Sequence, residues 1–238
     1  MKNAVLTQAL TQVLTQIPLV KGSSVIASQR IQNISSLDFS DDDIFETYLI
    51  ETLLLPPVVV PGPEATKIWH KHNPYTLFGA RDTSTGKLVG FMQAFPIREE
   101  LFDDILEGNF DDTSFAVTDI LQYDKPGKYK LYMASFCLHP DYREIRAFLF
   151  KMILNDFLET MIMLATQHEV YISDIIADAT TNESRVMCSG FGMKKIADSA
   201  HDTDVYHASI IPIATSSIRL KVVKQWKRFV AVYSEKWR

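Results

Sequence analysis

The sequence predicts an α/β (α+β) fold, in which a mixed and mostly antiparallel central sheet contains one parallel βαβ unit and is flanked by helices. The unit consists of a buried strand at residues 130–138, a helix that follows Pro140, and a second strand at 170–178. Two strands joined by a helix pair in parallel, through a right-handed crossover. Strand-turn-strand patterns on either side of the unit predict the antiparallel part of the sheet.

The first strand of the unit carries aromatic, β-branched and small apolar side chains without Gly or Pro, and the turn at 139–141 ends it. In the helix, apolar residues recur at helical spacing and are expected to face the sheet: Ile145, Phe148, Leu149, Met152, Ile153 and Phe157. The turn between strand and helix lies at the carboxyl end of a strand, where unpaired backbone N–H groups attract anions. We therefore expect a ligand at residues 140–143.

The first part of the chain contains two helical patterns and one strand. Residues 3–18 predict a short amphipathic helix, and residues 24–34 predict a first strand. Residues 40–55 predict a helix with Ser40 as its N-cap and three acidic residues in its first turn. The prolines at 55–63 predict an extended connection after it.

Two hairpins surround the βαβ unit. Residues 75–95 predict two strands around a turn that closes at Gly86, and residues 193–212 predict two strands around a turn near 201–203. Between the first hairpin and the unit, residues 98–112 hold seven carboxylates and one Arg. This acidic segment is interpreted as a solvated helix with a polar face or, alternatively, as an acidic wall that selects a cationic amine.

Composition indicates an ordinary globular protein, since 47% of the 238 residues are hydrophobic and 22% are charged. We expect one domain over 1–238, with an N-terminal helical extension at 1–23, a core at 24–212 and a basic C-terminal segment at 213–238. No apolar run approaches the ~20 residues of a membrane helix, and the N-terminus lacks a signal-peptide core. The expectation is a cytoplasmic protein without membrane contact.

The charge is unevenly distributed along the chain. The last twenty residues hold seven Lys or Arg and one Glu, a net +6, so the total of −5 leaves −11 on the remainder. An acidic body argues against a nucleic-acid partner. We expect the basic tail to pack on the protein's own acidic body or on a second subunit, as in a homodimer.

Cysteine and histidine patterns argue against a metal site. The two cysteines, Cys137 and Cys188, lie on separate elements and have no metal-ligand spacing. His70 and His72 could share a face of a strand but have no third ligand nearby in the sequence. No metal cofactor is expected.

Two motifs carry a resemblance to a known family. Leu-His-Pro-Asp-Tyr-Arg at 138–143 ends a strand and opens a helix, and the segment 182–196 begins a helix with Asn182 and closes it with the turn Phe191-Gly192-Met193. In this order they resemble the acyl-CoA-binding motifs of the GNAT superfamily of N-acyltransferases. The resemblance implies that acetyl-CoA or another acyl-CoA donates its acyl group to a small-molecule or peptide amine.

The resemblance also implies binding residues. The backbone of Cys137 and Leu138 would face the thioester arm, and a loop would hold the pyrophosphate: Asp141, Tyr142, Arg143, Glu144 and Arg146. Asn182 belongs to the second motif. Where the family has Gly at the third place after the motif Arg and Gly or Ala at the fifth, this chain has Arg146 and Phe148. We expect coenzyme A to bind weakly, with Arg143 and Arg146 both contacting phosphate.

Catalysis by direct attack of an amine on the thioester needs a base and a proton for the leaving thiolate. Many family members have a Tyr as the acid four places before the Gly of the second motif; here that place is Cys188, for which packing is the alternative role. The candidate bases are Asp174 and Asp178 on the second strand of the unit, and Glu99, with its neighbour Glu100, after the first hairpin.

Three functions remain open at this level. The first is an acyl-CoA-dependent N-acyltransferase. The second is a catalytically silent relative that uses the fold as a binding or interaction module, because the loop glycines, the Tyr acid and an evident base are missing. The third is an acyltransferase fed by the phosphopantetheine arm of an acyl-carrier protein, which would not need pyrophosphate contacts and would tolerate Arg146.

Overall fold

A mixed sheet of seven strands forms the centre of the protein. The computed structural model describes residues 29–56, 59–109, 115–199, 203–218, 220 and 223–237. The strands are β1 (Ile31–Ile34), β2 (Leu77–Asp82), β3 (Lys87–Ile97), β4 (Gly127–Leu138), β5 (Val170–Ala179), β6 (Lys194–Asp198) and β7 (Asp204–Ser209). They lie in the order β1-β2-β3-β4-β5-β7-β6, and β4 and β5 are the parallel pair. The predicted mixed sheet with one βαβ unit is therefore confirmed.

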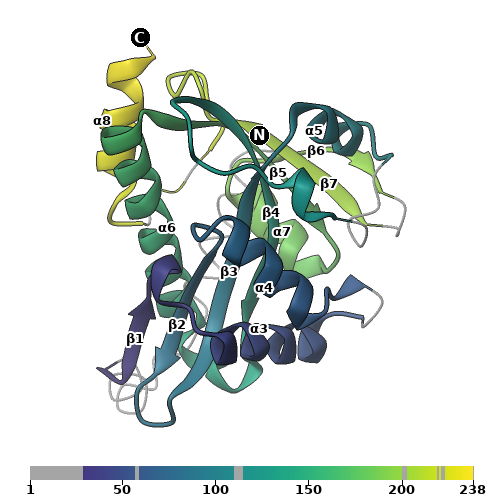
Figure 1. Ribbon diagram of the computed structural model, residues 1–238, viewed down its shortest axis with the longest axis vertical. Helices are drawn as coiled ribbons and strands as arrows, with labels where there is room; N and C mark the ends of the chain where they lie inside the picture. The colour runs from purple at the N-terminus through teal and green to yellow at the C-terminus, as the bar shows by residue number, and fades with distance from the viewer. Residues whose placement is uncertain are drawn as a thin grey trace, which may run out of the picture.

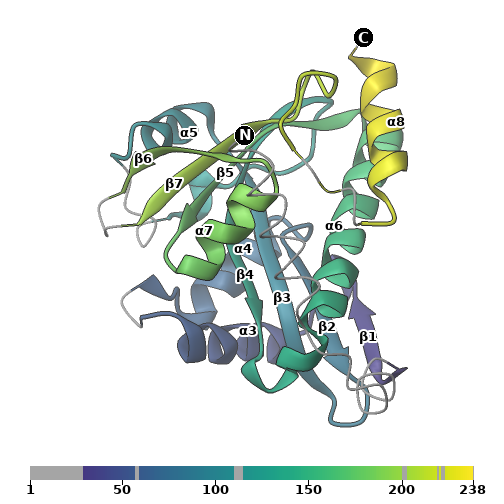
Figure 2. The same cartoon turned by 180° about the vertical axis from the view of Figure 1, so that it is seen from behind.

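Helices cover both faces of this sheet. They are α3 (Asp41–Leu54), α4 (Pro63–His72), α5 (Glu99–Leu106), α6 (Arg146–His168), α7 (Asn182–Gly190) and α8 (Trp226–Lys236), with short 3-10 turns η1 (Ser36–Asp38), η4 (Val117–Asp119) and η5 (Pro140–Ile145). Figure 1 looks onto the face covered by α3 and α4, and Figure 2 onto the face covered by α6 and α7. The largest core lies on the α6 side, and two smaller apolar clusters lie under α3, α4 and α5.

Helix α3 forms where Ser40 predicts its start. The Ser40 hydroxyl accepts from the Asp43 N–H, and the Asp43 carboxylate accepts from the Ser40 N–H at 2.9 Å, which is a complete capping box. The buried residues of α3 recur once per helical turn but include polar ones: Asp43, Ile44, Thr47, Ile50 and Glu51. The capping box and an ion pair with Arg81 account for Asp43, whereas an amphipathic helix normally buries an apolar stripe, so Glu51 needs another explanation.

Several predictions of local structure are confirmed and others are corrected. The first hairpin forms β2 and β3 around Gly86, whose φ of +73° suits Gly. Of the strand expected at 24–34, residues Ile31–Ile34 form β1, and residues 24–28 lie outside the described part of the chain. The helix expected at 3–18 also lies outside the described residues. His70 and His72 lie on helix α4 and not on a strand, because Pro63 is accepted in the first turn of a helix.

The C-terminal helix α8 packs along α6 and confirms that the tail lies on the protein's own body (Figure 2). Phe229 and Tyr233 are buried in this contact. The Tyr233 hydroxyl accepts a hydrogen bond from the Ile172 N–H of β5 at 3.0 Å, and the Lys236 ammonium pairs with Glu169 at 3.1 Å. Apolar packing therefore contributes to the docking of the tail alongside the charge attraction that we expected.

No helix in the part of the chain that the structure describes is long and apolar enough to cross a membrane.

Candidate active site

The parallel strands β4 and β5 separate near their carboxyl ends. Their pairing runs from Gly127 opposite Val170 to Met133 opposite Ala177 and stops there. Residues 134–138 of β4 continue alongside β3 alone. The edge of β4 that faces away from β3 is thus free of strand pairing over its last five residues, which leaves backbone groups for a ligand.

A β-bulge in β4 lies at this point of separation. On β3 Ala94 is opposite Met133 and the next residue, Gln93, is opposite Ser135, so Ala134 is the extra residue. The bulge changes which face the alternate side chains occupy. Leu131 and Met133 belong to the α6 core, whereas beyond the bulge Ser135 turns toward α3.

The direction of the backbone amides follows from one hydrogen bond. The His139 N–H donates to the Val89 carbonyl of β3 at 2.9 Å. Because amides alternate in direction along a strand, the N–H groups of Leu138 and Phe136 point to the free edge and that of Cys137 points to β3. Of the two residues expected at the thioester arm, Leu138 therefore turns its amide to the free edge, whereas Cys137 turns its amide toward β3 and its side chain toward α3.

The loop expected to hold the pyrophosphate is η5 and the first turn of α6. Asp141, Arg143, Glu144 and Arg146 are exposed there. Tyr142 is committed elsewhere, since its hydroxyl donates to the Asp82 carboxylate of β2 at 2.9 Å. The 3-10 turn runs directly into α6, and the Arg146 N–H already donates to the Arg143 carbonyl, so the exposed donors that remain for an anion are the two guanidinium groups.

Phenylalanine side chains around this opening differ from expectation. Phe148, predicted to face the sheet, is 38% exposed. The rest of the predicted face keeps its phase, since Ile145, Leu149, Ile153 and Phe157 are buried, so Phe148 lies at the edge of that face, and on its other edge packs Phe150. Its ring lies 5.0 Å from that of Phe136 and is stacked on Phe191 at 5.5 Å, between centroids. These three rings join α6, β4 and the end of α7.

The buried carboxyl group of Glu51 lies on the α3 side of the bulge. Glu51 is 2% exposed, and the Ser135 hydroxyl donates a hydrogen bond to it. No ammonium or guanidinium of the described residues pairs with it. Burial raises the pKa of Glu51 from 4.5 to about 7, although the Ser135 hydrogen bond opposes this shift. A carboxyl group that titrates near neutral pH at a strand opening is a candidate general base.

Sequence reasoning missed Glu51 because it lies in a helix with acids on several sides. The available signal was its phase. Glu51 follows Thr47 by four residues and Ile44 by seven, which is one and two helical turns, so it shares their buried face.

Two sequence-predicted residues are brought together near the opening. Cys188 of α7 is 1% exposed within the α6 core, and burial, with the Asp178 carboxylate nearby, raises the pKa of its thiol to about 12. Oδ1 of Asp178 is buried without a hydrogen-bond partner among the described residues. So weak an acid does not readily protonate a leaving thiolate, and the burial of Cys188 favours packing.

The other two catalytic candidates are engaged away from the opening. Asp174 accepts from Ser209 at 2.8 Å and lies 3.1 Å from Nε2 of His207, and it is opposite Lys130, in the part of β4 that still pairs with β5. Glu99 is exposed at the start of α5 and pairs with the Lys130 ammonium at 2.9 Å. Helix α5 buries Leu101, Phe102 and Ile105 and exposes its acids, as the solvated-helix interpretation expects: Glu99, Glu100, Asp103 and Asp104.

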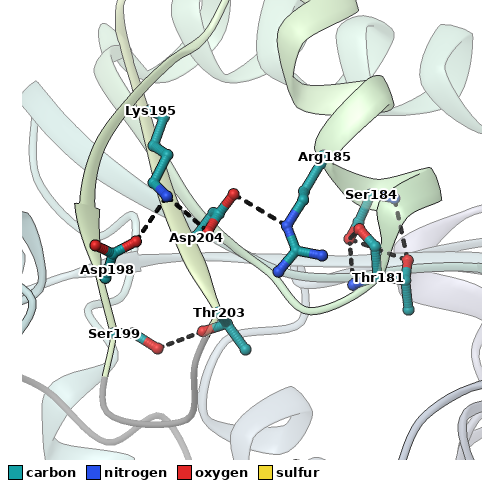
Figure 3. A network of polar contacts seen from close by, with 8 residues as sticks. All are labelled: Thr181, Ser184, Arg185, Lys195, Asp198, Ser199, Thr203 and Asp204. Atoms are coloured by element: carbon teal, nitrogen blue, oxygen red, sulfur yellow. Dashed lines mark hydrogen bonds and ion pairs between the residues drawn. The ribbon is translucent and has the colours of Figure 1, made fainter.

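A polar network fixes α7 and the last hairpin relative to each other (Figure 3). Asp204 of β7 accepts from Arg185 of α7 at 3.0 Å and from Lys195 of β6 at 2.9 Å. Thr181 caps α7 in a capping box with Ser184, so Asn182 is the first helical residue and is exposed. The predicted turn at 191–193 requires Gly192, because its φ is +85° and a Cβ there would meet the Ser217 carbonyl.

The described residues contain no group of three or more His, Cys, Asp or Glu side chains arranged to hold a metal ion.

Comparison with known proteins identifies the fold. No protein-family model and no curated protein matches the sequence. Among solved structures, the loading GNATL domain of CurA from Lyngbya majuscula matches with a TM-score of 0.53 at 12% identity, over 76% of this chain and 98% of that chain. Ard1 from Thermoplasma volcanium gives 0.47 at 12% identity over 75% and 95%, and a mosquito arylalkylamine N-acetyltransferase like 5b gives 0.48 at 12% over 75% and 99%. The sheet order, the βαβ unit and the first of these matches establish that this chain has the fold of the GNAT acyltransferases.

Proposed function

We propose that the protein is an acyl-CoA-dependent N-acyltransferase in which Ser135 and Glu51 accept the proton of the attacking amine. The observation that carries the proposal is the buried Glu51 carboxyl, hydrogen-bonded to Ser135 at the bulge where β4 leaves β5. A buried carboxyl group without a cationic partner destabilises a fold, so its presence here calls for a functional reason.

The acyl donor would lie along the free edge of β4. The N–H groups of Leu138 and Phe136 would hold its arm, and the guanidinium groups of Arg143 and Arg146 would hold its phosphates. Arg146 contributes a charged donor in place of the close backbone approach that Gly would give. The rings of Phe136, Phe150 and Phe191 border this path, which supports a narrow slot for the arm.

The chemistry then follows from the two sides of the bulge. The amine nitrogen attacks the thioester carbonyl carbon, the carbon–sulfur bond breaks, and the thiolate leaves. The ammonium proton passes to the Ser135 oxygen while the hydroxyl proton of Ser135 passes to Glu51. Because burial raises its pKa to about 7, a fraction of Glu51 is deprotonated at neutral pH and is able to take this proton. Solvent supplies the proton for the thiolate, since Cys188 is too weak an acid.

The direct test is turnover of acetyl-CoA with a panel of primary amines and peptides, followed by release of free thiol. Glu51→Gln keeps the shape and the hydrogen bond from Ser135 but cannot accept a proton, and we expect it to lower kcat about 10²-fold or more. Glu64→Gln is the matched control, because Glu64 is exposed on the neighbouring helix α4 and, within the part of the chain that the structure describes, pairs with Lys67 alone. Equal activity of wild type and Glu51→Gln would refute the assigned base.

Binding of the donor is tested separately. Acetyl-CoA at a hundredfold over its dissociation constant adds about 2.7 kcal/mol to stability, which a thermal shift detects. Absence of any shift with millimolar acyl-CoA would refute the proposal and favour the catalytically silent module.

A carrier-protein donor is a second candidate, favoured by the missing loop glycines at Arg146 and Phe148. A phosphopantetheine arm carries no nucleotide pyrophosphate and would need only the free edge of β4. One solved structure that this chain resembles is the loading GNATL domain of CurA. Activity with an acyl-carrier protein and none with acyl-CoA would identify this function.

A further inference from the structure

A buried glutamine interrupts the apolar layer beneath α3 and α4. Gln93 of β3 is 1% exposed. On the same face of β3, Phe91 on one side belongs to the apolar cluster under α3 and Phe95 on the other side belongs to the cluster under α4 and α5. The opposite residue on β2 is Leu77. Gln93 thus lies where the surrounding sequence is otherwise hydrophobic.

The polar neighbour of Gln93 is the candidate proton relay. Gln93 is directly opposite Ser135 on β4, so the two side chains share a face and their Cβ atoms are about 5 Å apart. Ser135 donates to Glu51 above it. Glu51, Ser135 and Gln93 therefore form a short polar row that separates two apolar clusters.

The side-chain nitrogen of Gln93 is a donor without an acceptor. Nε2 is buried and has no hydrogen-bond partner among the described residues. An unpaired buried donor is unfavourable, and an apolar side chain of the same shape would be neutral or stabilising at this place. Retaining the amide therefore indicates a hydrogen-bond acceptor that arrives with a ligand.

We propose that Gln93 determines specificity by donating a hydrogen bond to a carbonyl oxygen on the carbon next to the reacting amine. The acceptor class is then α-amino carbonyl compounds, such as amino-acid amides and the N-termini of peptides. This inference rests on the proposed function. An α-amine and the oxygen of its own carbonyl are about 3 Å apart, which matches a pair of sites on adjacent strands at Ser135 and Gln93.

The position of Gln93 favours the acyl acceptor over the acyl donor as its partner. The donor lies along the edge of β4 that faces away from β3. Gln93 stands on β3, one strand further from that edge than Ser135. An oxygen near Gln93 therefore belongs to the molecule that approaches from the α3 side, which is the amine.

The test compares phenylalanine amide with phenethylamine, which lacks the whole carboxamide group, with acetyl-CoA as donor and with each rate referred to the free-amine concentration. For the wild type we expect kcat/KM to favour phenylalanine amide by about 10- to 100-fold, because phenethylamine leaves the buried donor unpaired. Gln93→Met removes the donor at similar size, and the preference should fall to within about threefold of unity. Gln122→Met is the control, because Gln122 is exposed and already donates to the His72 carbonyl; it should leave the preference unchanged.

Thermal unfolding separates a structural role from this one. If Gln93 served the fold, Gln93→Met would lower Tm; we expect Tm to stay equal or to rise while the preference is lost. Turnover with an unchanged preference in Gln93→Met would overturn the specificity role and leave the proposed function standing. Turnover of neither amine, together with no thermal shift by acetyl-CoA, would overturn both.

Discussion

Replacing Glu51 by Gln should change how stability depends on pH, and this prediction needs no substrate. In the folded protein burial raises the pKa of Glu51 to about 7, against an ordinary value of 4.5. Between these two values the folded state binds more protons than the unfolded state. Stability therefore falls as pH rises from about 4.5 to about 7 and is constant above that range.

The magnitude follows from the size of the shift. A difference of about 2.5 in pKa, at 1.36 kcal/mol for each unit, amounts to about 3 kcal/mol that the wild type loses across this range. Glutamine is neutral throughout, so Glu51→Gln lacks this loss. We expect the variant to have a free energy of unfolding close to the wild type at pH 4.5 and to exceed it by about 3 kcal/mol at pH 8.

The assay is denaturant unfolding of both proteins at pH values from 4.5 to 8. Asp156 is a partly buried carboxyl, whose pKa burial raises from 3.8 to about 6. It is present in both proteins and cancels in the comparison. Asp156→Asn serves as the matched control, because it should lose the pH dependence only between about 3.8 and 6. Parallel curves for the wild type and Glu51→Gln over the whole range would refute the reasoning about Glu51.

Three further changes test other parts of the structure. Ser135→Ala leaves the Glu51 carboxylate without its donor; we expect the apparent pKa in the kcat/KM profile to rise above that of the wild type and the rate at pH 7 to fall, and an unchanged profile would contradict the relay. Arg146→Gly should leave coenzyme A affinity within about tenfold in calorimetry, whereas adding Arg143→Ala should abolish binding; a hundredfold gain in Arg146→Gly would instead show that this side chain blocks the phosphates. Tyr233→Phe leaves the Ile172 N–H of β5 unpaired and should cost about 1–3 kcal/mol in urea unfolding, while no cost would mean that the amide finds water.

The order of elements was accessible from the sequence because each depends on local patterns. The strand at 130–138 ends at a Pro, Ser40 caps its helix, and Gly86 closes a turn, and the structure confirms all three. Residues 55–63 are predicted as an extended connection and His70 and His72 as part of a strand, whereas Pro63 starts helix α4, because Pro is accepted in the first turn of a helix. The helical count in α6 was correct for Leu149, Ile153 and Phe157, whereas Phe148 lies at the edge of their face, and the sequence does not show how far the buried face extends sideways.

The candidate site was less accessible because it depends on pairing between distant segments. Glu51, Gln93 and Ser135 come from α3, β3 and β4, and no spacing in the sequence links them. The bulge at Ala134 turns Ser135 toward Glu51, and a bulge depends on the register of the partner strand. By contrast, Asp174 and Glu99 stood out as carboxylates beside predicted strands, and both have partners elsewhere: His207 and Ser209 for the first, Lys130 for the second.

The missing glycines of the loop and the buried polar row bear on the same question, which is whether the chain retains catalysis. A silent binding module would have no need for Glu51, and an apolar residue facing Cys137 and Ile50 would stabilise α3 by removing a buried carboxyl group. The side-chain Nε2 of Gln93, which is buried without a hydrogen-bond partner among the described residues, is a second unfavourable group in the same polar row. Arg146 and Phe148, in comparison, are exposed changes that affect how a nucleotide is held and leave the reacting side of β4 intact. A chain that had lost its chemistry would be expected to lose the costly buried groups first, so the pattern favours an acyltransferase whose donor is held in an altered way.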